Sequence, residues 1–241
     1  MASHAPSGFD APSSRFDAQR ERLSAYFDGT ARKAWIELTS DVKVSGIRAT
    51  VRAGRDAMRE LLLDWLPHDL RRTRLLDAGC GTGALSVLAA RRGAEVVAVD
   101  VAAGLVAIAQ ERQPSFLGHG RIDWRVGDML DPAHGQFVHV VAMDSLIHYR
   151  PEDIVATVTA FAARCERSMV FTFAPATPML RAMHAAGKLF PRSDRAPAIV
   201  PVAEPQLVSK LHAALPEWRV ARRERVGSGF YISHALELVR R

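Results

Sequence analysis

The stretch Asp77-Ala78-Gly79-Cys80-Gly81-Thr82-Gly83 decides the fold of this chain. It follows the apolar pair Leu75-Leu76 and precedes a helical pattern over Ala84 to Arg92, so we expect it to form the turn between a strand and a helix. Its three glycines permit a tight turn, a close approach of the backbone to a ligand, and close packing of the helix on the strand. The turn therefore predicts a nucleotide site, with a sharp strand-to-helix turn that binds nothing as the alternative.

Acidic residues follow the next two predicted strands and favour the nucleotide site. The strand Val96 to Val99 is followed by Asp100, 17 residues after Gly83, where a carboxylate accepts hydrogen bonds from ribose hydroxyls. The strand Arg121 to Val126 is followed by Gly127-Asp128-Met129. An acidic and an apolar side chain at that position suit an adenine ring.

Strands and helices alternate along most of the chain, which predicts a mostly parallel sheet with helices on both faces. The predicted fold class is α/β, with seven strands and a closing antiparallel hairpin. The hairpin joins Trp218 to Val226 with Phe230 to Leu238 across Gly227-Ser228-Gly229. The remaining predicted elements are the strands Phe137 to Met143 and Met169 to Phe173, and the helices Ala102 to Arg112, Glu152 to Arg164 and Glu204 to Ala214.

Two amphipathic helices are predicted before the first strand. One covers Phe16 to Phe27, and the other covers Val51 to Leu66. Residues 1–13 have little apolar content, and we expect them to be disordered. The chain thus divides into this tail, an N-terminal helical region over 14–70, and a main domain over 71–241.

An irregular insertion is predicted at about 174–203, within the main domain. It contains five prolines and a short helical pattern from Met179 to Leu189. Together with the N-terminal helices, this insertion is expected to form a lid over the site.

Composition excludes several classes of protein. The chain has 241 residues, 48% apolar and 24% charged, which excludes disorder, collagen-like repeats and a coiled coil. No apolar run reaches the roughly 18–20 residues of a membrane span, and the first 20 residues lack the apolar core of a secretory signal. The two cysteines, Cys80 and Cys165, exclude a disulfide framework and favour a cytoplasmic location.

The formal charge is +6, and all but four of the 32 basic residues are Arg. A basic surface suits a nucleic acid, an anionic membrane or a ligand with carboxylates, but Arg richness equally fits a coding bias. Four arginines, Arg48, Arg52, Arg55 and Arg59, recur at helical spacing. The pattern favours a solvated helix face, with a cationic rim for an acidic ligand or partner as the alternative.

The glycine turn with its acidic neighbours resembles the Rossmann-like S-adenosylmethionine-dependent methyltransferases, whose first motif reads DxGxGxG. A dinucleotide dehydrogenase would instead show GxGxxG. The resemblance implies S-adenosylmethionine as cofactor and S-adenosylhomocysteine as product. Cys80 is expected to be a small residue that fills the turn, with a nucleophile as the less favoured alternative. The cofactor-binding residues that the resemblance implies are Asp77, Gly79, Gly81, Gly83, Asp100, Asp128 and Met129.

From about residue 20 to the C-terminus, the chain also resembles one family of these enzymes, the magnesium-protoporphyrin IX O-methyltransferases of chlorophyll and bacteriochlorophyll synthesis. Many relatives have Asn where this chain has Asp28, so the chain departs from the family there but keeps a polar side chain. The matching motifs are Tyr26-Phe27-Asp28-Gly29-Thr30 with Trp35, Arg52-Ala53-Gly54-Arg55 with Trp65-Leu66, Asp144-Ser145-Leu146-Ile147-His148-Tyr149, and Leu189-Phe190-Pro191 with Ser193-Asp194-Arg195.

This resemblance implies methyl transfer to a propionate carboxylate of magnesium-protoporphyrin IX. It implies that Tyr26 and His148 are the catalytic residues beside the transferred methyl. Without the resemblance, the residues alone leave two alternatives open: Tyr26 only packs against its neighbours, and His148 only caps a loop. Expected partners are the porphyrin substrate, the porphyrin-binding subunit of magnesium chelatase and a membrane surface.

Three other functions remain as alternatives. The first is methylation of another small acceptor, such as a quinone precursor or a phenol, and the second is a porphyrin carrier without turnover. The third, a tRNA methyltransferase, rests on charge alone, and the absence of an RNA-binding module argues against nucleic acid as a partner. No metal site is predicted, because His119, His134 and His139 are scattered and lack ligand spacing; His139 is expected to be packed or hydrogen-bonded within its strand.

Overall fold

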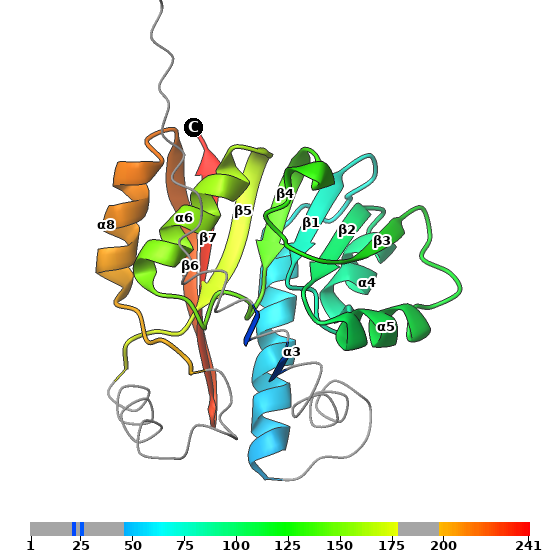
Figure 1. Cartoon of the computed structure of the whole chain (residues 1–241), viewed down its shortest axis with the longest axis horizontal. Helices are drawn as coiled ribbons and strands as arrows, with labels where there is room; N and C mark the ends of the chain where they lie inside the picture. The colour runs from blue at the N-terminus through cyan, green and yellow to red at the C-terminus, as the bar shows by residue number, and fades with distance from the viewer. Residues whose placement is uncertain (1–20, 23–24, 27–45, 178–197) are drawn as a thin grey trace, which may run out of the picture.

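A seven-stranded sheet forms the centre of the computed structural model, which describes residues 21–22, 25–26, 46–177 and 198–241 (Figure 1). The strand order is β3-β2-β1-β4-β5-β7-β6. The first five strands pair in parallel, and β7 pairs antiparallel with both β5 and β6. This confirms the predicted fold class. The strands are β1 (Arg74–Ala78), β2 (Glu95–Asp100), β3 (Arg121–Val126), β4 (Phe137–Ala142), β5 (Cys165–Phe173), β6 (Trp218–Ser228) and β7 (Tyr231–Arg240).

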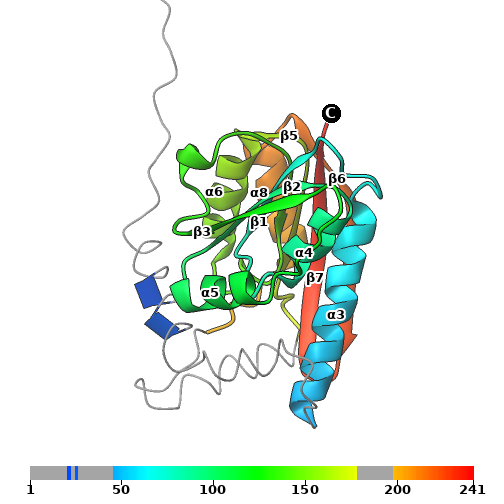
Figure 2. The ribbon, with the colours of Figure 1, turned by 90° about the vertical axis from the view of Figure 1, so that its right-hand side faces the viewer.

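Helices cover both faces of the sheet (Figure 2). Apolar side chains of α3 and α4 pack with Leu75 and Val96 of one face, and those of α6 and α8 pack with Leu76 and Val97 of the other. Since neighbouring residues of a strand point to opposite faces, each strand serves both cores. The helices are α3 (Ile47–Trp65), α4 (Ala84–Arg91), α5 (Ala103–Glu111), α6 (Pro151–Ala162) and α8 (Glu204–Ala214), with a short 3₁₀ turn, η1 (Pro132–His134).

The closing hairpin is tighter than the sequence predicted. Gly227 and Ser228 belong to β6 and pair with Ile232 and Tyr231, so the turn contains only Gly229 and Phe230. Strand pairing continues through the predicted linker because a two-residue connection suffices when a glycine takes a positive φ, here 56° at Gly229. The strand β5 likewise begins at Cys165, four residues before the predicted start.

The two ends of the predicted insertion meet. Pro175 and Val202 form a parallel bridge, with Ala176 N donating to Val202 O at 2.9 Å and Val202 N donating to Ala174 O at 2.8 Å. Residues 178–197, including the predicted helix from Met179 to Leu189, lie outside the described residues, as does the tail 1–13. Of the predicted helix Phe16 to Phe27, the pieces 21–22 and 25–26 are described and are helical.

Candidate functional site

The site lies where β1, β2, β3 and β4 end, because parallel strands bring their carboxyl ends to one edge of a sheet. Backbone hydrogen bonds join the loops there. Gly79 N and Cys80 N both donate to Val99 O, at 2.8 and 3.0 Å, and Gly127 N donates to Asp100 O at 2.9 Å. The three predicted cofactor segments are thus adjacent in space.

The glycine turn approaches the loop after β4 closely. Gly79 has φ 81°, and a Cβ atom there would lie 2.4 Å from Cβ of Ser145. A side chain at residue 79 would therefore be strained and would collide with the next loop. Gly83, with φ 80°, caps the N-terminus of α4, which leaves the first amides of that helix directed at the turn.

Asp100 orders the turn from the neighbouring strand. Its Oδ2 accepts a hydrogen bond from Gly81 N at 2.8 Å, and its Oδ1 accepts one from Ala102 N at 2.9 Å. The side chain is half-buried at the end of β2. Each carboxylate oxygen can accept a further hydrogen bond, so the same group can receive ligand hydroxyls.

Asp77 is almost completely buried at the end of β1, beneath the turn. The Ser86 hydroxyl of α4 donates to its Oδ2 at 2.5 Å. Burial, reinforced by the negative charge of Asp100, raises the pKa of Asp77 to about 7, against an ordinary 3.8. Within the chain, this carboxyl group joins β1 to the first turns of α4.

The segment after β3 leaves room beside its backbone. A Cβ atom at Gly127 would meet no atom of the described residues within 4 Å. The following turn is fixed from within, since Leu130 N donates to Asp128 Oδ1 at 2.9 Å and His134 Nε2 lies 2.7 Å from Asp128 O. Arg164 Nη2 donates to Met129 O at 3.3 Å. Asp128 and Met129 therefore occupy a fixed turn next to open space.

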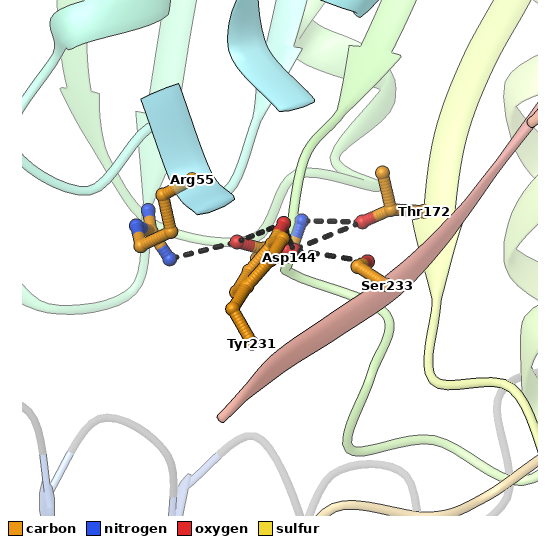
Figure 3. Close-up of polar contacts among 5 residues, drawn as sticks. All are labelled: Arg55, Asp144, Thr172, Tyr231 and Ser233. Carbon is orange, nitrogen blue, oxygen red and sulfur yellow. Dashed lines mark hydrogen bonds and ion pairs between the residues drawn. The ribbon is translucent and has the colours of Figure 1, made fainter. Parts of the chain in front are cut away.

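Asp144, two residues after the end of β4, is contacted by side chains from three other elements (Figure 3). Arg55 of α3 donates from Nη1 to its Oδ2 at 2.8 Å, and the Tyr231 hydroxyl of β7 lies 3.0 and 3.2 Å from its two oxygens. Ser233 Oγ and Thr172 Oγ1 donate to Oδ1 at 3.4 and 3.3 Å. Burial, together with the charge of Asp144, raises the pKa of Tyr231 well above its usual range, so this phenol stays protonated.

The contacts of Arg55 correct the interpretation of the arginine stripe as a solvated helix face. The preferred solvated helix face is wrong at this residue, because its side chain is only 20% exposed and forms an ion pair with Asp144. Arg59 also has an acidic partner, Asp56, at 2.7 Å. That pair lies within α3, so of these two arginines Arg55 is the one shown to contact another part of the chain.

The two predicted catalytic residues lie in different parts of the chain. His148 is in the loop that begins at Asp144, where its Nδ1 lies 3.3 Å from Ala198 O. Tyr26 is half-buried in the helical piece 25–26, which precedes α3 in the chain. A joint action of the two side chains stays a prediction.

The sequence predicts structural and not chemical roles for His139 and Cys80, and their surroundings in the fold agree with this. His139 is buried in β4, with Nδ1 2.7 Å from Ser168 Oγ, and burial lowers its pKa to about 4. This confirms that it is packed and hydrogen-bonded within its strand. Burial near Asp77 and Asp100 raises the pKa of the Cys80 thiol, which agrees with a residue that fills the turn.

Comparison with known proteins assigns the chain to a family. Residues 75–167 match a methyltransferase domain, and residues 142–240 match the C-terminus of magnesium-protoporphyrin IX methyltransferase. The magnesium-protoporphyrin O-methyltransferase of Rhodobacter capsulatus is 50% identical over 219 residues, covering 90% of this chain and 95% of that protein. This chain belongs to the magnesium-protoporphyrin O-methyltransferase family.

Solved structures agree with membership of this methyltransferase family. The crystal structure of magnesium protoporphyrin IX methyltransferase from Synechocystis PCC 6803 with bound S-adenosylhomocysteine matches with a TM-score of 0.80 and 27% identity, covering 92% of this chain and 99% of that one. A geranyl diphosphate C-methyltransferase from Streptomyces coelicolor matches with a TM-score of 0.66 at 14% identity, and shares the fold alone.

The sequence does not predict the cluster of hydrogen bonds around Asp144. It places this residue only in a loop motif, and Tyr231 and Thr172 only in strands. One signal is present in the sequence: an acidic residue directly follows the predicted apolar strand Phe137 to Met143, as Asp100 follows the predicted strand Val96 to Val99. The carboxyl edge of a parallel sheet is where such residues gather.

Proposed function

We propose that this chain transfers the methyl group of S-adenosylmethionine to a propionate carboxylate of magnesium-protoporphyrin IX, giving the monomethyl ester. The observation that carries the proposal is the 50% identity to the Rhodobacter capsulatus enzyme over nearly the whole chain. The glycine turn and its acidic neighbours at the carboxyl edge of the sheet support it. A quinone precursor or phenol as acceptor is not favoured, since the ubiquinone O-methyltransferase of Xanthomonas oryzae matches only 46% of this chain.

The residues at the sheet edge fit the cofactor. The backbone at Gly79 leaves no space for a side chain, and Asp100 offers acceptor positions suited to ribose hydroxyls. Ser145 Oγ is buried beside Gly79 without a hydrogen-bond partner among the described residues, and a bound ligand would supply one. When bound, the cofactor supplies a methyl group on a positively charged sulfur.

The reaction requires little proton transfer by the protein. A propionate has a pKa near that of Glu, about 4.3, and is an anion at neutral pH. Its oxygen forms the new bond to the methyl carbon as the carbon–sulfur bond breaks, and the bonding pair returns to sulfur. Because opposite charges neutralise each other in this step, water would stabilise the reactants more than the transition state. Alignment and exclusion of water are therefore the main tasks of the site.

We assign orientation of the carboxylate to His148 and covering of the reacting groups to Tyr26. His148 lies in the loop that begins beside the glycine turn, and the backbone holds this loop from the other side, since Val200 N donates to Ile147 O at 2.9 Å. A neutral imidazole can also accept the proton of a carboxyl group that arrives protonated.

The deciding experiment incubates purified protein with S-adenosylmethionine and magnesium-protoporphyrin IX and measures the pigment by mass spectrometry. The expected result is the gain of one methyl group, with S-adenosylhomocysteine formed in equal amount. Binding of S-adenosylhomocysteine without methylation of the pigment would refute the acceptor and keep the enzyme class. Protoporphyrin without magnesium serves as the control acceptor.

Attachment to a membrane surface is the second part of the proposal. None of the described helices combines the length and apolar character needed to cross a bilayer. Ile47 at the start of α3 and Phe230 in the hairpin turn are both more than half exposed, and Phe230 N donates to Thr50 Oγ1 of α3, so the two lie at one end of the molecule. Cosedimentation with anionic vesicles should fall when both become Ser. The porphyrin-binding chelatase subunit is the competing partner, and capture by that subunit alone would contradict membrane attachment.

A further inference from the structure

Asp144 has a backbone conformation that its residue type rarely adopts. Its φ is 55°, in the left-handed region, although it is not a glycine. Its backbone N donates to Thr172 Oγ1 at 2.7 Å, which fixes the first peptide of the loop against β5. Such strain persists only where the surrounding contacts hold it, and it is concentrated at functional sites.

The side chain of Asp144 supplies those contacts. The carboxylate side chain is 6% exposed and receives hydrogen bonds from α3, β5 and β7 (Figure 3). Because Arg55 brings a positive charge to it, the buried negative charge is compensated. The group therefore fastens α3 to the end of β4 and to the closing strand.

The loop fastened in this way carries the groups proposed to act in the site. Ser145 lies directly against Gly79, and within the part of the chain that the structure describes its buried hydroxyl has no hydrogen-bond partner. His148 follows three residues later and contacts Ala198 O. A displacement of Asp144 would move both side chains relative to the glycine turn.

We propose that Asp144 is a positioning residue that holds Ser145 and His148 in place for methyl transfer, with Arg55 and Tyr231 as its supports. The inference rests on the proposed function. Asp144 itself touches neither substrate nor cofactor in this account, since its carboxylate is directed at α3 and β7.

A second buried acid, Glu237 of β7, is linked to α3 through Arg222 of β6 and provides a control. Arg222 of β6 donates to Glu237 of β7 at 2.6 and 2.9 Å, and to Trp65 O at the end of α3. Glu237 is 3% exposed and lies opposite Val170 in β5, within the strand and not in a loop of the site. Loss of either acid should weaken the contact of α3 with the sheet, but only Asp144 adjoins the reacting groups.

The test compares Asp144→Asn with Glu237→Gln in the full chain. Both should lower the melting temperature. For Asp144→Asn, kcat per folded molecule should fall at least about tenfold, while the Kd of S-adenosylhomocysteine changes less than about threefold. For Glu237→Gln, kcat should stay within about twofold of the parent. Folded molecules are counted by the stoichiometry of S-adenosylhomocysteine binding.

Two further variants keep the test decisive if Asp144→Asn fails to fold. Tyr231→Phe removes one hydroxyl and should lower kcat without changing the Kd of S-adenosylhomocysteine. Arg55→Lys should retain more of kcat than Arg55→Gln, because a cation remains. Equal kcat in all variants, with only stability lost, would overturn the proposal. Absence of methyl transfer in the parent protein would instead refute the proposed function.

Discussion

A Cβ atom at Gly54 would lie 2.4 Å from Cδ1 of Tyr231 and 2.7 Å from its Cβ, so α3 can rest on β7 only because residue 54 has no side chain. This close approach brings Arg55, the next residue, within reach of Asp144. The glycine that weakens α3 as a helix thus permits the contact on which the site loop depends.

Replacement of Gly54 by Ala should destabilise the protein. Ala is the better helix former by about 1 kcal/mol, but the collision with a buried ring should outweigh this and lower the free energy of unfolding by about 1–3 kcal/mol. Urea denaturation measures the change. Ala57→Gly is the control. Because residue 57 is exposed on α3, this variant measures the effect of helix propensity on stability without a steric collision. A gain in stability at Gly54→Ala would show that α3 can move away without cost.

Gly79→Ala should weaken cofactor binding. The new Cβ would lie 2.4 Å from Cβ of Ser145 at a φ of 81°, so the turn or the loop after β4 must shift. Titration with S-adenosylhomocysteine should show an affinity at least about tenfold weaker, or about 1.4 kcal/mol.

Gly135→Ala is the control for this variant. Its φ of 82° also lies in the region that L side chains rarely adopt, but the nearest atom is the flexible end of Arg74, at 2.9 Å, and the residue is outside the site. It should lose stability and keep its affinity for S-adenosylhomocysteine. Equal affinities in both variants would mean that the glycine turn does not bind the cofactor.

Asp77 predicts a specific dependence of stability on pH. Its pKa is about 7 in the folded chain, against 3.8 ordinarily, so the folded state binds the extra proton between about pH 4 and 7. Across that window the stability of the parent protein should fall relative to Asp77→Asn as pH rises, by at most about 1.4 kcal/mol per pH unit, and the difference should be constant above pH 8.

Urea denaturation of both proteins at several pH values between 4 and 8 measures this difference. His139, whose pKa is lowered to about 4, contributes the opposite slope, but it is present in both proteins and cancels in the comparison. Parallel curves would contradict a protonated Asp77.

His148→Ala and Tyr26→Phe should each lower turnover with little effect on cofactor binding. A side chain that orients or protonates a reacting group contributes about 10²–10⁴-fold, so we expect kcat to fall by about 10²-fold for His148→Ala. The Kd of S-adenosylhomocysteine should change by no more than about threefold. His119→Ala, at an exposed histidine, should have normal kcat. Normal turnover in both variants would leave the two residues with packing roles only.

The local sequence determined the cofactor edge of the fold. The glycine turn and the acids at Asp77 and Asp100 are contiguous with their own strands, and a parallel sheet necessarily brings strand ends together. The alternation of strands and helices predicted the parallel part of the sheet and the closing hairpin in the same way. The hairpin turn was misplaced by two residues, because register depends on the partner strand and not on the turn residues alone.

Only the tertiary structure decided how Asp144 is held. Arg55 and Asp144 are 89 residues apart in sequence, and Tyr231 is a further 87 residues along. In the sequence, Arg55 belongs to a basic helix stripe, Asp144 to a loop motif and Tyr231 to an apolar strand. None of these three local patterns indicates that the residues contact one another. Their meeting follows from β7 inserting beside β5 and from α3 crossing onto it at Gly54. Local periodicity specifies which face of an element is buried, whereas the identity of the neighbour across that face is set by the packing of the whole chain.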